Sequence, residues 1–112
     1  MNKKKIFVVF VNPKIESEFE KLQNGKFEDK KLFDYITRAI ENLKQNPLAG
    51  IKIPKNLWPE KYIKEYQITN LWKYNLPNAW RLIYTIKSDD VQLINVLLEW
   101  FDHKNYEKRF GY

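Results

Sequence analysis

Three strand-like runs follow one another in the last third of the chain, and they limit its fold more than any other feature of the sequence. Leu71 to Leu76, Trp80 to Ile86 and Val91 to Phe101 are rich in aliphatic and aromatic residues. Short turns at Pro77 to Ala79 and at Ser88 to Asp90 separate them. Because connections this short join neighbouring antiparallel strands, the three runs predict an antiparallel meander.

Upstream of the meander, the pattern predicts one strand and two helices. Ile6 to Val11 is a short apolar run rich in β-branched residues, and Asn12-Pro13 ends it. Lys14 to Gln23 and Glu28 to Gln45 repeat their apolar residues with the 3.6-residue period of a helix. The short connection between these two segments indicates a helical hairpin with one apolar face.

The segment between the hairpin and the meander is less regular. Gly50 to Asn56 allows a short edge strand, because Pro54 is tolerated only at a sheet edge. Pro59 is predicted to begin one or two helical turns. The complete prediction is a single α+β domain over residues 1–112, in which the N-terminal strand and the meander form one curved sheet with helices packed on one face.

Composition narrows the kinds of site that this chain can carry. The sequence has no cysteine and one histidine, so we expect neither a disulfide nor a metal site, and no cofactor or small-molecule ligand. Nowhere do 18 apolar residues follow one another, so no membrane span is expected. The basic start MNKKK precedes an apolar run that is too short for a signal peptide. These features fit a protein of the reducing cytoplasm.

The charge of the chain favours negatively charged partners. With 20 Lys and Arg residues against 14 Asp and Glu residues, the formal net charge is +6. Nucleic acid, ribosomes and acidic proteins are partners of this kind. A lysine-rich surface without any such partner is the alternative.

Side-chain alternation predicts which residues of the meander share a face. Packing the apolar sets together places Leu82 opposite Val96 and Tyr84 opposite Ile94. Arg81 then lies opposite Leu97, and the turn at Pro77 places Asn75 opposite Arg81 and Lys73 opposite Ile83. We therefore expect one sheet face on the helices and a second, polar face, with the following residues on it: Lys73, Arg81, Asn95, Glu99 and, at the rim where the last strand ends, His103.

Arg81 is the least expected residue of this polar face, because burying a guanidinium without a partner is costly. It either pairs with a carboxylate such as Glu99 or binds an external anion.

The C-terminal residues resemble a known family. NLWKYNLPNAWRLIYTI and the following VQLINVLLEWFDHKNYEKRFGY are similar to the RelE/ParE superfamily of small toxins, with Trp80 to Tyr84 as its aromatic-Arg-aliphatic-aliphatic-Tyr hairpin. The order of predicted elements agrees with that superfamily over essentially the whole chain. The DHKNY segment resembles the end of RelE-type ribonucleases, which carries a histidine and a tyrosine.

This resemblance implies a ribosome-dependent endoribonuclease that cleaves mRNA in the A site without a metal and is inhibited by a cognate antitoxin. The 2′-OH of the mRNA attacks the neighbouring phosphate, which requires a base, a cation at the phosphate and an acid for the leaving oxygen. By resemblance, Arg81 stabilises the phosphate, His103 is the acid, and Tyr106 stacks on a base or orients the 2′-OH. The alternative role of Tyr106 is to anchor the C-terminus on the helices, and both roles stay open.

The resemblance leaves the remaining roles open. Lys52 and Lys55 occupy positions where relatives carry RNA-binding lysines, although the segment around them is longer here, and Lys73 is a third candidate. The general base is Glu99, Glu60 or Glu65.

Two other functions fit the same fold. One is a ParE-like poison that traps gyrase without cleaving RNA. The other is a catalytically inactive, basic module that binds RNA or the ribosome.

Overall fold

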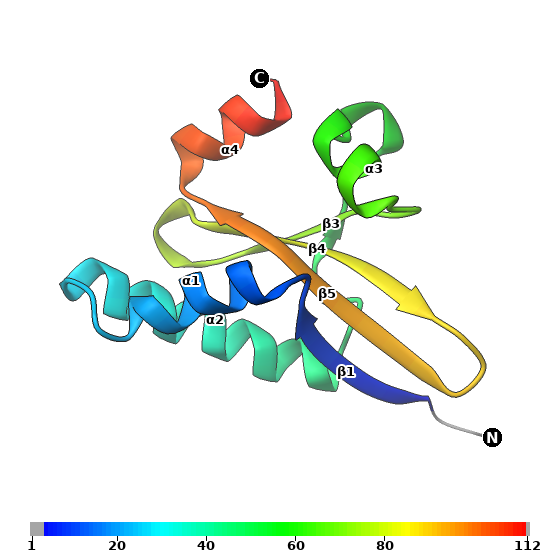
Figure 1. The fold of residues 1–112 in the computed structure, drawn as a ribbon, viewed down its shortest axis with the longest axis horizontal. Helices are drawn as coiled ribbons and strands as arrows, with labels where there is room; N and C mark the ends of the chain where they lie inside the picture. Colours follow the sequence, from blue (N-terminus) through cyan, green and yellow to red (C-terminus); the bar gives the residue numbers. More distant parts are fainter. Residues whose placement is uncertain (1–3, 112) are drawn as a thin grey trace.

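The computed structural model describes residues 4–111 and has a five-stranded mixed sheet with helices on both faces (Figure 1). The strand order is β1-β5-β4-β3-β2, with β1 parallel to β5 and all other neighbours antiparallel. The elements in chain order are β1 (Lys5–Phe10), α1 (Pro13–Leu22), α2 (Phe27–Gln45), β2 (Ile51–Lys52), the 3₁₀ turn η1 (Lys55–Leu57), α3 (Glu60–Tyr66), β3 (Trp72–Asn75), the 3₁₀ turn η2 (Pro77–Ala79), β4 (Arg81–Ser88), β5 (Gln92–Phe101) and α4 (His103–Phe110). The α+β class, the helical hairpin and the meander are confirmed.

The helical hairpin of α1 and α2 covers one face of the sheet. Asn12 starts α1, because its Oδ1 accepts a hydrogen bond from the Ile15 backbone N–H at 2.9 Å. The buried residues of α2 are spaced at helical intervals. They pack on side chains of β4 and β5, with partly buried side chains of β1 and β3 at the margin. This first core consists of Leu32, Ile36, Ala39, Leu43, Leu76, Leu82, Tyr84 and Leu97.

The opposite face is covered in part by α3 and α4, and this is where the structure differs from the expected open polar face (Figure 1). Tyr62 of α3 and Tyr106 and Phe110 of α4 pack on Ile83 and Leu98 of the sheet. Since Leu82 and Ile83 are neighbours in one strand, their two cores lie on opposite faces. The sheet is thus enclosed by helices on both sides along part of its length.

The C-terminal helix α4 was not predicted. The Asp102 side chain accepts a hydrogen bond from the Asn105 backbone N–H at 2.9 Å, which is an N-cap, and Gly111 ends the helix with a φ of 76°. Tyr106 and Phe110, four residues apart, form its buried side. The predicted end of the last strand at Phe101 is confirmed, but His103 lies in the first turn of α4 and not at the rim of the sheet.

The pairing of β3 with β4 is as predicted, whereas the predicted pairing of β4 with β5 is wrong. Asn75 lies opposite Arg81 and Lys73 opposite Ile83. In contrast, Leu82 lies opposite Trp100, not Val96. Tyr84 lies opposite Leu97 instead of Ile94, and Arg81 opposite Phe101.

Two local features cause this change of register. The Asp89 carboxylate accepts hydrogen bonds from the Val91 and Gln92 backbone N–H groups, both at 2.9 Å, and so moves the turn later in the chain. A β-bulge then interrupts the ladder between Ile83 and Tyr84. As a consequence Asn95 is fully buried opposite Ile86, on the α1–α2 side, and is not part of the face that carries Arg81.

Candidate functional site

Two cations meet at one buried tyrosine on the face that α3 and α4 cover. Tyr106 of α4 is buried, the Lys73 Nζ lies 5.3 Å from its ring centroid, and the Arg81 guanidinium carbon lies 5.2 Å from the same centroid. Lys73 Nζ also donates a hydrogen bond to the Tyr106 hydroxyl at 3.4 Å. We call Lys73, Arg81 and Tyr106 the cation–tyrosine cluster. Cation–π contacts of this kind hold both positive charges at a defined place on the sheet.

Neither cation of this cluster is neutralised by a carboxylate within residues 4–111. Arg81 Nη1 donates a hydrogen bond to the Ala79 carbonyl oxygen at 2.5 Å, and its buried Nε has no hydrogen-bond partner there. The ion pairs of this part of the chain involve other cations. The proposed pairing of Arg81 with Glu99 is therefore not formed, and the positive charge of the cluster is available to an anion.

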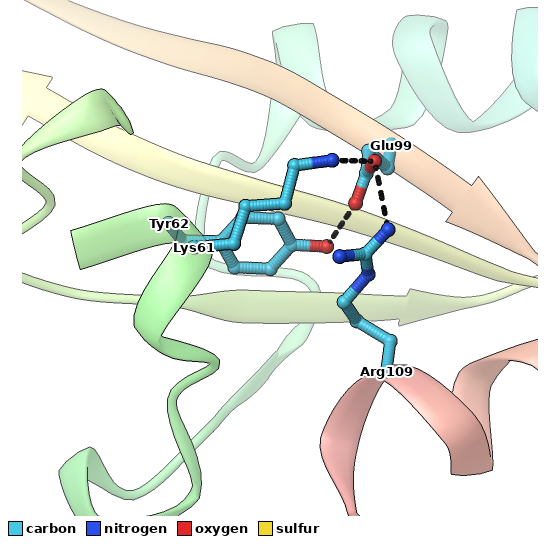
Figure 2. A network of polar contacts seen from close by, with 4 residues as sticks. All are labelled: Lys61, Tyr62, Glu99 and Arg109. Atoms are coloured by element: carbon cyan, nitrogen blue, oxygen red, sulfur yellow. Dashed lines mark hydrogen bonds and ion pairs between the residues drawn. The ribbon is translucent and has the colours of Figure 1, made fainter. Parts of the chain in front are cut away.

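Glu99 has its own set of partners, shown in Figure 2. Its side chain is 14% exposed, and its Oε1 lies 3.3 Å from Lys61 Nζ and 3.6 Å from Arg109 Nη2. The Tyr62 hydroxyl donates a hydrogen bond to Oε2 at 2.5 Å. We call these four residues the Glu99 network. It joins α3, α4 and β5 through one carboxylate.

The environment of Tyr62 shows how strongly this network is shielded from water. Burial raises the pKa of the Tyr62 phenol well above its usual value, and the hydrogen bond to Glu99 and the negative charge of that carboxylate raise it further. Tyr62 therefore stays protonated and acts as a hydrogen-bond donor to Glu99. Two hydrogen bonds and a further ion pair with Arg109 hold the Glu99 carboxylate in one orientation.

His103 lies in the first turn of α4 and is largely exposed. Its side chain is 60% exposed, and its Nε2 contacts the Glu107 carboxylate one helical turn later. Tyr106 is three residues after His103, so the two side chains lie on neighbouring positions of one helix face. His103 is thus one turn from the cation–tyrosine cluster, without a direct contact to Arg81.

The remaining predicted residues are distributed over other surfaces. Lys52 lies opposite Trp72 in the edge strand β2, and Trp72 packs on the first core, so Lys52 is on the other face from Lys73. Lys55 is exposed in η1. Glu60 and Glu65 are exposed on α3, and Glu60 pairs with Lys64 at 3.0 Å.

A cleft of about 720 Å³ lies beside the Glu99 network. Its walls come from the start of α3, the residue before β4, the end of β5 and α4, and they combine aromatic and basic side chains with the acidic residues Glu60 and Asp102. Lining residues include Lys61, Trp80, Trp100, Phe101, Lys108 and Arg109. Trp80 precedes Arg81 in the chain and Phe101 is the cross-strand neighbour of Arg81, so the cleft adjoins the cation–tyrosine cluster.

Four contacting residues were missed at the sequence level: Lys61, Tyr62, Glu107 and Arg109. One of these contacts has a local signal. His103 and Glu107 are four residues apart and follow the N-cap residue Asp102, which is the pattern of a side-chain pair on a helix. The contacts of Glu99 with Tyr62 and Lys61 join residues 37 and 38 positions apart in sequence, and no local pattern indicates them.

Two features of the described residues limit the kinds of site. No group of three or more His, Cys, Asp or Glu side chains among residues 4–111 is arranged to hold a metal ion. None of the helices in that range is long and apolar enough to span a membrane.

Comparison with known proteins identifies the family. The sequence profile described as the ParE toxin of type II toxin-antitoxin systems, parDE, matches residues 9–98. No significant match was found among curated proteins or among solved structures. The profile covers most of the chain, including β3, β4 and Arg81, and it confirms the resemblance to the RelE/ParE superfamily. A toxin of this type has a cognate antitoxin as its partner. The chain therefore belongs to the ParE toxin family of type II toxin-antitoxin systems.

Proposed function

We propose that this toxin is a ribosome-dependent endoribonuclease, which cleaves mRNA in the A site and is neutralised by its antitoxin. The observation that carries the proposal is the cation–tyrosine cluster, in which Lys73 and Arg81 converge on Tyr106 without a carboxylate partner within residues 4–111. Two cations in such an arrangement suit a phosphate group that gains negative charge during the reaction.

Phosphate stabilisation and proton donation to the leaving oxygen are each assigned to groups of this chain. The 2′-OH of one nucleotide attacks the adjacent phosphorus, the bond to the 5′-oxygen breaks, and a 2′,3′-cyclic phosphate and a free 5′-OH result. Arg81, assisted by Lys73, stabilises the charge on the phosphate oxygens. His103 gives a proton to the leaving 5′-oxygen, and Glu107 orients its imidazole ring.

The base that accepts the 2′-OH proton stays open among Glu99, Glu60 and Glu65. The two hydrogen-bond donors and the additional ion pair around Glu99 favour a positioning role for it, and Glu60 and Glu65 are on the exposed side of α3. Tyr106, which is buried beneath the two cations, supports their positions. The adjoining cleft, with Trp80 and Lys108 in its wall, offers aromatic and basic contacts for the mRNA strand. Lys52 and Lys55 are assigned to contacts with the mRNA backbone away from the reacting phosphate.

A non-nucleolytic gyrase poison is the second candidate. The family match favours it in one respect, because the profile ends at residue 98, before Glu99, His103 and Tyr106. The third candidate, an inactive RNA- or ribosome-binding module, is favoured by the exposure of His103 and its contact with Glu107, since no direct contact joins it to Arg81.

A cleavage assay on ribosomes programmed with a defined mRNA tests these assignments. Arg81→Ala is expected to lower the cleavage rate by roughly 10²- to 10³-fold, and His103→Ala by roughly 10²- to 10⁴-fold. Arg38→Ala, an exposed arginine on α2, is the matched control and should cleave like the wild type. Unchanged cleavage by both site variants would remove the assignment. Gyrase-dependent DNA breakage in place of mRNA cleavage would establish the second candidate.

A further inference from the structure

The cleft beside the Glu99 network has the size of a small-ligand site and begins next to the cation–tyrosine cluster. Its volume is about 720 Å³. Phe101 lines the cleft, lies opposite Arg81 in the sheet, and has the Arg109 guanidinium carbon 5.6 Å from its ring centroid. An RNA strand that has one phosphate at Arg81 can therefore place a neighbouring nucleotide in this cleft.

Aromatic side chains form one part of the cleft wall. Trp80, Trp100 and Phe101 line it, and each of them is only partly buried. Trp80 and Asp102, which both line the cleft, are the first residues beyond the last cross-strand pair of β4 and β5. A nucleobase stacks on an aromatic ring whatever its identity, because every base has a flat π face. The aromatic wall thus suits a nucleobase but does not select one.

A positive charge in the cleft wall is available to a phosphate. Lys108 is exposed and forms no ion pair within residues 4–111. The acidic residues of the wall do not neutralise it, since Glu60 Oε1 lies 3.0 Å from Lys64 Nζ and Asp102 Oδ1 accepts the N-cap hydrogen bond from Asn105. A lysine in this position attracts the backbone of a single RNA strand.

Asp102 has one carboxylate oxygen left for a ligand. Its Oδ1 accepts hydrogen bonds from the backbone N–H and from the side-chain amide of Asn105, both at 2.9 Å. Its Oδ2 forms no hydrogen bond with any part of the chain that the structure describes. An ionised carboxylate only accepts hydrogen bonds, and cytosine offers it an exocyclic amino group where uracil has a carbonyl oxygen.

We propose that the cleft binds the nucleotide next to the cleaved phosphate, with its base stacked on Trp80, its backbone at Lys108 and an exocyclic amino group donating a hydrogen bond to Asp102 Oδ2. Asp102 is then a specificity-determining residue, which selects a base with such an amino group against uracil. The proposal rests on the proposed endoribonuclease function and specifies the mRNA sequence that this function requires beside the cleaved bond.

The test is the affinity of the purified toxin for two trinucleotides, one of cytidine and one of uridine. Both are methylated at the 2′-oxygen so that they cannot be cleaved, and the two bases have rings of the same size. An NMR titration measures each Kd and shows which tryptophan indole signals move. The cytidine trinucleotide is expected to bind roughly tenfold more tightly. It should shift the signals of Trp80 and Trp100 but not that of Trp72, which does not line the cleft. Equal affinity for the two trinucleotides would overturn the proposal.

Asp102→Asn tests the selection without removing α4, because asparagine is as good an N-cap as aspartate. The variant replaces the free carboxylate oxygen by an amide nitrogen, which donates a hydrogen bond to the uracil oxygen. The preference for cytidine should therefore disappear or reverse in favour of uridine. Asn12→Asp exchanges the N-cap of α1 in the opposite sense and should keep the wild-type preference. A wild-type preference in Asp102→Asn would contradict the assignment of Oδ2.

Lys108→Glu tests the backbone contact with a substitution at an exposed position. It is expected to raise the Kd of both trinucleotides by roughly fivefold or more, whereas Lys30→Glu on α2 should leave both unchanged. Equal effects of the two substitutions would count against the cleft as the binding site. These measurements need no cleavage, so they separate two failures. A toxin that prefers cytidine but leaves mRNA intact contradicts only the proposed function, and one that cleaves mRNA without this preference contradicts only the present inference.

Discussion

At the scale of single residues, the Glu99 side chain forms structural contacts at a position where the sequence suggests a catalytic residue. Its carboxylate contacts Lys61, Tyr62 and Arg109, which come from two helices that flank the same face of the sheet. Removing the charge of a shielded carboxylate leaves its cations without compensation. Glu99 therefore contributes to the position of α4, and through α4 to that of Tyr106.

Glu99→Gln is expected to lower the free energy of unfolding by about 1–3 kcal/mol, because the amide loses both ion pairs in a shielded site. The control is Glu41→Gln on α2, whose ion pair with Lys44 at 3.9 Å is solvent-exposed and should contribute less than about 1 kcal/mol. Urea unfolding of the two variants measures the difference. Equal losses in both variants would show that the Glu99 network has no special structural weight.

Tyr84 leads to a prediction about alkaline pH. Burial raises the pKa of its phenol to about 12, even though the Gly50 backbone N–H donates a hydrogen bond to its oxygen at 3.1 Å and so favours the ionised form. The folded state thus keeps the proton more strongly than the unfolded state does. This stabilisation is complete below pH 10 and is lost as the pH rises from about 10 towards 12.

We expect Tyr84→Phe to be less sensitive than the wild type to a rise from pH 9 to pH 11, although it lacks one hydrogen bond. Over the full titration, the free energy of unfolding of the wild type should fall by roughly 2–3 kcal/mol more than that of Tyr84→Phe. Chemical unfolding at a series of pH values measures it. Parallel stability curves for the two proteins would show that Tyr84 titrates normally.

At the scale of elements, the helices and strand pairings that were predicted correctly are those fixed by residues close together in the sequence. The apolar period marks α2, and the short turn at Pro77 sets the register that brings Lys73 and Arg81 to one face. The pairing of β4 with β5 was wrong, because a bulge and the Asp89 turn change the alternation. A bulge has no reliable sequence signal in a strand such as β5, which has apolar residues on both of its faces.

The helix α4 was missed although its signals are present. Asp102 is an N-cap residue, and Tyr106 and Phe110 are at helical spacing. This segment directly follows the strand-like run that ends at Phe101, and its residues were therefore expected at the rim of the sheet. No local sequence pattern indicates that α4 brings Tyr106 into contact with Lys73 and Arg81.

Asp102→Ala is predicted to lower the free energy of unfolding by about 1 kcal/mol through the lost N-cap. Asn12→Ala removes the corresponding cap of α1 and should have a similar effect on stability. Only Asp102→Ala should also reduce mRNA cleavage, because α4 carries His103 and supports the cation–tyrosine cluster. Thermal unfolding and the ribosomal cleavage assay, applied to both variants, check this; an equal loss of cleavage in both would contradict it.

At the scale of the whole molecule, the two faces of the sheet are covered to different extents. The α1–α2 side carries the larger helical layer and the first core. The other side carries the cation–tyrosine cluster at the end covered by α3 and α4, and exposed side chains of β1, Phe7 and Val9, at the end that these helices leave uncovered. The order of elements and the basic charge could be predicted from sequence. The partial covering of this second face could not, since it depends on long-range contacts such as those of Glu99 and Leu98.

The central claim is that the toxin cleaves mRNA by attack of the 2′-OH at a phosphate held by Arg81. The most direct measurement is mapping of the mRNA ends produced on translating ribosomes, with identification of the end groups, for the wild type and for Arg81→Ala. With the wild type, we expect breaks in the A site that carry a 2′,3′-cyclic phosphate and a 5′-OH. With Arg81→Ala, the number of breaks should be lower by roughly 10²-fold or more. Intact mRNA on ribosomes saturated with a wild-type toxin that still arrests growth would contradict it.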